Sequence, residues 1–529
     1  MSGTLRRGAR PGQGVDARRA NPQSRARMIA RPSFRKWLMA LALASAAALS
    51  AGCAQNAATG RSQFVTLSPE DEIRIGREEH PKVLEAFGGA YDNPRLAAYV
   101  QRIGAGLAAK SELPDLPFTF TVLNSDIYNA FALPGGYIYI TRGLLALMGS
   151  EAELASVLGH EIGHVTARHT AERLARANAA NIGTAILSVG VAILTGSGDA
   201  GQLAGQATGA LAGTVLASYS REQEFEADTL GVRYMALLGY DPEEAADMLA
   251  KLGEGTRLEM RVAGRSPDEA DRFSILQTHP RTADRVRAAL DAARRAGLQT
   301  VADPRQNVAE YYAAIDGMAW GGDAKSGFVK GRRYVHPTLR FRFEAPEGFR
   351  LMNGEDAVRA IGPNGAQIVL DARRGRSADP ADFLVREWAQ GARLAGVERI
   401  QVNGLAAATG VTRVQGNGGP VDARLVAIRH PDGAFYRLLF LSPAQATARF
   451  NEAFRRATYS FAVLTAQEAQ EGPLRLRIVR AASGDTDETL ARRMATGDGF
   501  ERDRFRLIND LRPGQNVVAG RPYKIVAER

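Results

Sequence analysis

The stretch VLGHEIGHVTARH, residues 157–169, constrains the fold more than any other part of this 529-residue chain. Ser150 and Glu153 ahead of it match the capping box that starts a helix. Apolar residues then follow at helical spacing: Leu154, Val157, Leu158 and Val165. The stretch is therefore predicted to be one half-buried helix. His160 and His164, four residues apart, would project from one face of it.

This spacing suits a catalytic zinc site. Two imidazoles one turn apart can reach one metal ion, and Glu161 stands about 100° round the helix, beside the open position. Zinc lowers the pKa of a bound water, and a neighbouring carboxylate can accept its proton and pass it to the leaving amine. Histidine occurs only seven times in the chain, so we favour catalysis over two packed or solvated histidines. His169 falls off this face and is expected to be a solvated helix residue.

A third protein ligand is required, because two histidines hold zinc poorly and no cysteine is available for the site. The stretch SYSREQEFEADTLGVRYM supplies Glu224 and Asp228, four apart on a predicted helix. Glu222 and Glu226 have the same spacing, so the pattern alone does not choose between the two pairs.

The net charge of +10 is concentrated at the N-terminus. Residues 1–52 contain ten of the 67 basic residues and one of the 57 acidic residues, which leaves 57 basic and 56 acidic residues in the rest of the chain. The charge therefore gives no support to a nucleic-acid partner.

That basic leader runs into WLMALALASAAALSAGCAQ, a short apolar segment with small residues at its end. The pattern is typical of a secretory signal, so residues 1–52 are predicted to be a signal peptide, with Met28 as a possible true start. The end of the segment, LSAGC, resembles a bacterial lipobox, although Ser50 stands where leucine is usual. Cys53, the only cysteine, is accordingly expected to be lipidated and, since Ala54 follows it, to anchor a periplasmic protein at the outer membrane.

Four motifs in order resemble metallopeptidase family forty-eight, the family of the CAAX prenyl proteases and HtpX, over residues 60–300. They are NAFALPGGYIYITRGLL, HEIGH, SREQEFEAD and THPRTADR. The resemblance implies a zincin-like (gluzincin) domain that binds one Zn²⁺ per chain, with Glu224 as the third ligand and Asp228 orienting a ligand. It also implies that GGYIYI is the exposed edge strand on which substrate is laid, through Gly136, Tyr137, Ile138 and Tyr139.

His279, in LQTHPRTADR, has three interpretations. In relatives with a similar THP segment, the histidine can occupy the open zinc position as an inhibitory latch, or a late histidine can stabilise the oxyanion. It could also be a plain surface residue before a helix. We favour the latch and count His279 with Glu161 among the catalytic candidates.

The predicted fold class is α+β: a mainly helical peptidase domain with a small sheet (53–316), a small α+β domain of unknown role (328–465) and a LysM-like βααβ domain (472–529). Residues 317–327 are expected to be a linker. A Gly-rich segment between His164 and Glu224 is expected to be a lid over the cleft, because its second half is too polar to span a membrane. The LysM resemblance implies peptidoglycan as a partner.

The function expected from these features is a zinc endopeptidase that cleaves misfolded or stalled envelope proteins, with no nucleic-acid partner. The alternative is a lipid-anchored chaperone or scaffold that binds clients and cell wall with little proteolysis. The intact HEIGH favours the enzyme, since a binding module has no need of a general base.

Overall fold

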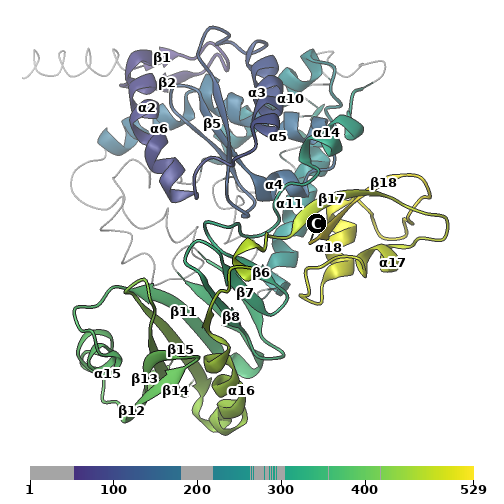
Figure 1. The fold of residues 1–529 in the computed structure, drawn as a ribbon. Coiled ribbons are helices and arrows are strands. Elements are labelled where there is room, and N and C mark those ends of the chain that lie inside the picture. Colours follow the sequence, from purple (N-terminus) through teal and green to yellow (C-terminus); the bar gives the residue numbers. More distant parts are fainter. Residues whose placement is uncertain are drawn as a thin grey trace, which may run out of the picture. The chain divides into compact units, whose positions relative to one another are not determined.

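The computed structural model (Figure 1) describes residues 53–179, 219–262, 304–354, 357–416 and 419–528, with single residues between 264 and 294 that include His279 and Arg285. The predicted signal peptide and the Gly-rich segment lie outside the described residues, so both stay predictions. Among the described residues, no helix is both long enough and apolar enough to cross a bilayer.

The region before the histidine helix begins with two short strands, β1 (Cys53–Gln55) and β2 (Ser62–Phe64), and two helices, α2 (Pro69–Ala86) and α3 (Pro94–Ala108). Each helix has proline in its first turn and a side-chain cap, from Ser68 to α2 and from Asn93 to α3. Such starts suit proline, whose missing N–H would have no intrahelical partner there.

A three-stranded sheet follows, made of β3 (Thr119–Leu123), β4 (Ala130–Leu133) and β5 (Tyr137–Thr141) in the order β3-β5-β4. The prediction that residues 136–139 form the edge strand is therefore wrong. β5 is parallel to β3 on one side and antiparallel to β4 on the other. The Tyr139 ring is buried and stacks on Phe131. β3 and β4 are the two terminal strands, and β4 packs against the histidine helix.

The histidine helix is α5 (Glu151–Thr166), which follows α4 (Arg142–Leu147) and begins at the cap Ser150 as predicted. It packs against α10 (Arg221–Leu237), and the contact is made by small residues. A Cβ on Gly163 would lie 2.8 Å from the carbonyl oxygen of Ala227, and one on Gly231 would lie 2.8 Å from the amide nitrogen of His160. Glycine therefore lets the two helices approach closely enough for their side chains to share one site.

Two further helices, α11 (Glu244–Val262) and α14 (Val308–Ile315), flank this pair, and α6 (His169–Ala179) follows α5. The turn between α5 and α6 is sharp because Arg168 adopts a left-handed conformation, with φ of 55°. This turn directs the first residue of α6, His169, back toward α5.

Residues 328–465 form two antiparallel sheets. The larger has the order β12-β13-β14-β15-β11-β10-β9 and the smaller β16-β8-β7-β6. The strands are β6 (Phe328–Lys330), β7 (Arg333–His336), β8 (Phe341–Glu344), β9 (Arg350–Asn353), β10 (Val358–Ile361), β11 (Gln367–Arg373), β12 (Ala395–Val402), β13 (Leu405–Gly416), β14 (Gly419–Arg429), β15 (Phe435–Pro443) and β16 (Ala462–Val463). The long strands β14 and β15 form a hairpin, and the helix α16 (Thr447–Ser460) follows it.

The last region has the predicted order of strand, helix, helix and strand: β17 (Arg475–Arg480), α17 (Asp487–Ala491), α18 (Glu501–Ile508) and β18 (Pro522–Ala527). Its core is continuous with that of the peptidase region, since Leu476 and Tyr523 belong to the same hydrophobic cluster as Tyr311 and Leu154. The predicted linker also takes part, because the amide of Trp320 donates to the carbonyl of Leu474 at 2.8 Å.

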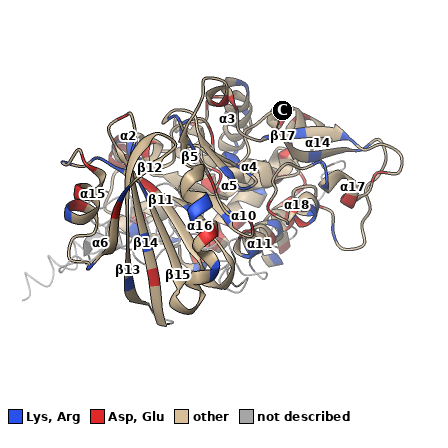
Figure 2. Cartoon of the chain, turned by 60° about the horizontal axis from the view of Figure 1, so that its bottom comes forward, with Lys and Arg blue, Asp and Glu red and all other residues tan. Residues whose placement is uncertain are grey.

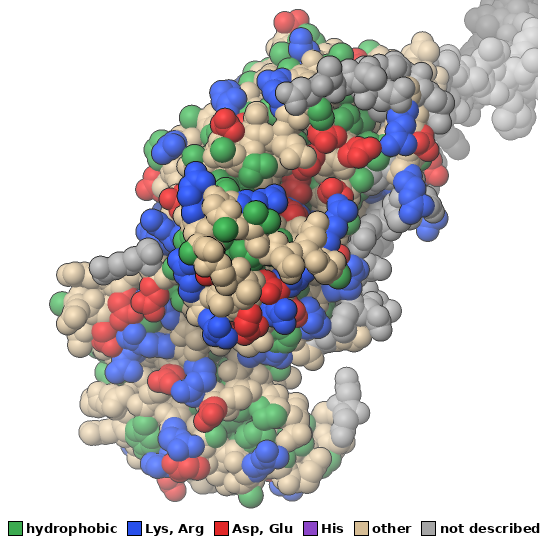
Figure 3. Space-filling view, turned by 90° about the vertical axis from the view of Figure 1, so that its right-hand side faces the viewer, with side chains coloured by type: hydrophobic (Ala, Val, Ile, Leu, Met, Phe, Trp, Pro, Cys, Tyr) green, Lys and Arg blue, Asp and Glu red, His purple; other side chains and the backbone are tan. Residues whose placement is uncertain are grey.

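Acidic and basic residues are both scattered over the described elements (Figure 2), and their side chains are intermingled on the face shown in Figure 3. This distribution agrees with the charge balance of the chain beyond residue 52.

Candidate metal centre

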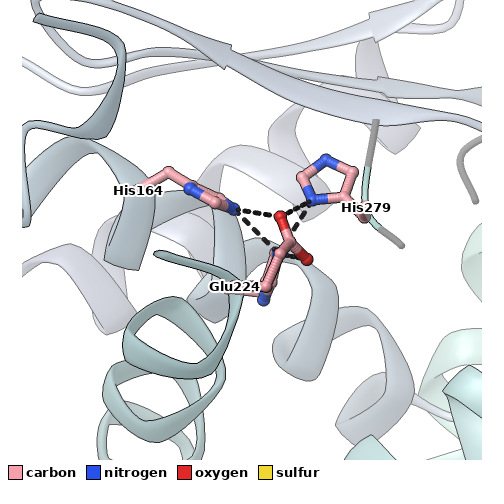
Figure 4. A group of neighbouring side chains, drawn as sticks. His164, Glu224 and His279 are labelled. Atoms are coloured by element: carbon pink, nitrogen blue, oxygen red, sulfur yellow. Dashed lines mark hydrogen bonds and ion pairs between the residues drawn. The ribbon is translucent and has the colours of Figure 1, made fainter. Parts of the chain in front are cut away.

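Side chains from α5 and α10 meet at one buried point. The Nε2 atoms of His160 and His164 lie 3.0 Å apart, and Oε1 of Glu224 lies 3.4 Å from Nε2 of His164. With one atom of His279, these ligand atoms all lie within 4.8 Å of one another. Figure 4 shows His164, Glu224 and His279 pointing toward a common centre. Two imidazoles, a carboxylate and an additional histidine are a donor set that suits Zn²⁺.

Among the three glutamates at the start of α10, only Glu224 faces the two histidines. Its side chain is 0% exposed, whereas Glu222 is exposed to solvent and Glu226 contacts His169 instead. Burial disfavours the charged carboxylate of Glu224. Interactions with the nearby His279, His164 and His160 outweigh this effect and hold the pKa of Glu224 well below the usual range. The structure thus distinguishes the pair Glu224 and Asp228 from the pair Glu222 and Glu226, which helical spacing alone did not.

His279 is buried in the same centre, so the interpretation as a surface histidine is wrong. Its Nδ1 atom lies 2.9 Å from Oε1 of Glu224 and 3.1 Å from Nε2 of His160. Its Nε2 atom lies 3.6 Å from Oε1 of Glu161. His279 is therefore placed where a fourth metal ligand would lie.

Glu161 projects beside this centre and is 1% exposed. Burial raises the pKa of the Glu161 carboxyl, and the charges on His279 and His160 offset only part of the effect. Oε2 of Glu161 and Nε2 of His279 are buried without a hydrogen-bond partner among the described residues. Buried polar atoms are rarely left in this state, which indicates that the centre accommodates a further polar group.

Asp228 and Arg285 contact the candidate ligands His160 and Glu224. Oδ1 of Asp228 lies 2.8 Å from Nδ1 of His160, and Arg285 forms ion pairs at 2.5 Å with both Asp228 and Glu224. A carboxylate on the second nitrogen of a ligand histidine fixes the ring and its tautomer. The sequence pointed to Asp228 alone, although Arg285 is the last residue of the motif THPRTADR.

His169 is not solvated as predicted but is 0% exposed. The left-handed Arg168 ends α5 and turns the His169 ring toward His164, so the periodicity of one continuous helix does not apply to it. Tyr219, another residue that sequence reasoning missed, stacks on the ring of His164 with centroids 3.8 Å apart.

A small cavity of about 50 Å³ adjoins Glu161 and His279. Apolar side chains from α5, α10 and α11 line it: Val157, Val232, Met248, Leu249 and Leu252. The cavity therefore suits an apolar side chain next to the candidate metal position.

Residues 94–293 match the model of Peptidase family M48. Similar curated proteins include the beta-barrel assembly-enhancing protease of Escherichia coli (strain K12), 32% identical over 42% of this chain and 43% of its own length. The mitochondrial metalloendopeptidase OMA1 of Schizosaccharomyces pombe is 30% identical over 43% of this chain and 63% of its own length, and that of Arabidopsis thaliana is 38% identical over 28% of each chain. The chain thus spans less than two thirds of these relatives. The matches support a metallopeptidase of the M48 type.

Proposed function

We propose that this chain is a zinc-dependent endopeptidase of the bacterial cell envelope. His160, His164 and Glu224 would hold one Zn²⁺, and Glu161 would act as general base. The observation that carries the proposal is the convergence of these ligands within 4.8 Å beside a buried oxygen of Glu161 that has no hydrogen-bond partner among the residues the structure describes. Lewis-acid activation of water is the chemistry that the ion supplies when bound.

The protein's own groups divide the remaining work. Glu161 accepts the proton released as water attacks the peptide carbonyl and returns it to the departing amine, a role that its raised pKa favours. Asp228 orients His160 through the 2.8 Å contact. His279, placed among the ligand atoms, acts as a latch on the fourth position and leaves it when substrate enters.

An extended substrate would be laid along the sheet, as the resemblance implies, but along β4 rather than the central β5. β4 is one of the two terminal strands of its sheet and is the one that packs more extensively against α5, so an added strand there would lie near Glu161. The apolar cavity beside Glu161 would then accept a hydrophobic side chain next to the scissile bond.

The substrates we propose are misfolded or stalled envelope proteins, a class consistent with the name of the Escherichia coli relative. The export signal and lipidation at Cys53 would place the enzyme in the periplasm, anchored to the outer membrane. Residues 472–529 would contact peptidoglycan. Replacement of Cys53 by alanine is expected to release the protein from membranes or leave its signal uncut.

The test combines zinc analysis of the purified protein with digestion of casein. One zinc per chain and proteolysis that stops when a chelator is added support the enzyme. Zinc without proteolysis of casein or of any unfolded envelope protein would overturn it in favour of the chaperone or scaffold.

A further inference from the structure

The two candidate zinc histidines of α5 are supported in different ways. Nδ1 of His160 faces a carboxylate directly, that of Asp228. Nδ1 of His164 instead faces a second imidazole, with Nδ1 of His169 at 2.8 Å. Nε2 of His169 in turn lies 2.9 Å from Oε2 of Glu226. A histidine thus stands between a candidate metal ligand and a carboxylate.

The carboxylate determines the direction of every hydrogen bond in this chain. An ionised Glu226 can only accept, so Nε2 of His169 donates to it. A neutral imidazole carries one N–H, which leaves Nδ1 of His169 as the acceptor for the Nδ1–H of His164. His164 therefore keeps its lone pair on Nε2, the atom that lies 3.0 Å from His160 and 3.4 Å from Glu224.

We propose that His169 is a positioning residue that fixes the tautomer and ring orientation of His164 for metal binding. It would do so through the relay His164–His169–Glu226–Arg61. The proposal rests on the proposed zinc site. In that site, the relay would orient His164 through His169, as Asp228 orients His160 by direct contact.

The far end of the relay is held by the segment that follows β1. Arg61 forms ion pairs at 2.9 Å with Glu226 and with Glu172 of α6. The same segment is attached to the C-terminal end of α5, where Asn56 donates to the carbonyl of Thr166 at 3.0 Å and Gln63 to that of Ala167 at 2.7 Å. These contacts hold Arg61 in place, so Glu226 has a defined position from which to orient His169.

Simple core packing would also bury His169, but it would not require a partner on each ring nitrogen. An apolar residue of similar size satisfies packing and leaves Nδ1 of His164 without an acceptor. The two explanations therefore differ in their consequences for metal affinity rather than for folding.

The experiment compares His169→Leu with His169→Asn in the full chain, with zinc affinity measured by competition with a chromophoric chelator. Loss of such a supporting contact weakens metal binding by about 10- to 100-fold, which is the effect expected for leucine. Asparagine retains an oxygen near the position of Nδ1 and should recover most of the affinity. With zinc in excess, kcat on a peptide should fall in His169→Leu while KM stays unchanged.

The matched control is His336→Leu, which removes a histidine that is also buried but belongs to β7. It should leave zinc affinity unchanged. Wild-type affinity in a folded His169→Leu protein would overturn the relay, as would equal losses in the leucine and asparagine variants.

If His169→Leu does not fold, the relay is tested with Glu226→Gln instead. The Glu226 side chain is 19% exposed, so the fold should tolerate this substitution. Zinc affinity reduced severalfold supports the relay, and unchanged affinity overturns it. Absence of zinc binding by the wild type would overturn the proposed function first, and this inference with it.

Discussion

Nδ1 of His279 lies 2.9 Å from Oε1 of Glu224, so a third histidine occupies the centre together with the three candidate ligands. His279, which belongs to neither helix, thus reaches a point defined by α5 and α10. Its position among the ligand atoms is the arrangement that a latch requires, because a histidine there competes with substrate for the fourth position.

We expect His279→Ala to increase proteolysis, including self-cleavage, because the fourth position opens to water and substrate. The measurement is cleavage of a peptide and of an unfolded protein at equal zinc content. If His279 stabilises the oxyanion instead, activity should fall by roughly a hundredfold or more. Equal activity of variant and wild type on both substrates would contradict both roles.

Glu161→Gln should retain zinc and lose peptide hydrolysis by about two to four orders of magnitude, since it removes the base without removing a ligand. Metal analysis and a peptide assay on the same sample check this result. Glu224→Ala serves as the contrasting variant, because it should lower zinc content itself. Normal turnover in a zinc-loaded Glu161→Gln protein would exclude Glu161 as the base.

Lys524→Met should destabilise the fold by about 3 kcal/mol, because a buried amino group that donates hydrogen bonds is replaced by a thioether. Nζ of Lys524 donates to the carbonyls of Ala146, Leu147 and Met148, at the end of α4, and these oxygens would lose their donor. Urea unfolding measures the change, with the exposed Lys325→Met as control. A loss no larger than that of the control would show that residues 472–529 do not support the peptidase core through Lys524.

Glu244→Gln should stabilise the protein more at pH 8 than at pH 5. Burial and the neighbouring Glu153 raise the pKa of Glu244 to about 7. This pKa lies above the unfolded value, so the stability that protonated Glu244 contributes is complete below about pH 4.5 and is lost as the pH rises through 7. Glutamine removes this loss, and we expect a gain of roughly 1–3 kcal/mol at pH 8.

Urea unfolding at both pH values provides the measurement, and Glu243→Gln is the matched control because the Glu243 side chain is 70% exposed. An equal effect of Glu244→Gln at pH 5 and pH 8 would show that Glu244 does not titrate between them.

Local patterns were sufficient to predict α5, its cap at Ser150 and the projection of His160 and His164 from one face. They were also sufficient for the order of elements in residues 472–529. Each of these features depends on periodicity and turn chemistry within a few residues, which the sequence states directly.

Long-range pairing was not predictable in this way. The alternation of residues 136–139 predicts a strand. That strand, β5, is central because it pairs with β3 on one side and with β4 on the other, which local spacing does not show. The left-handed Arg168 turned His169 from the expected solvated position into a partner of His164.

The sequence alone thus determined which side chains can carry zinc chemistry and the helix that presents two of them, because helical spacing is a local property. Helical spacing left two pairs of carboxylates open, and the tertiary structure places Glu224 beside the histidines and brings His279 and Arg285 to it. It also joined residues 472–529 to the peptidase core. These outcomes depend on the approach of α10 to α5 through Gly159, Gly163 and Gly231, and such contacts between distant segments have no signature in local spacing.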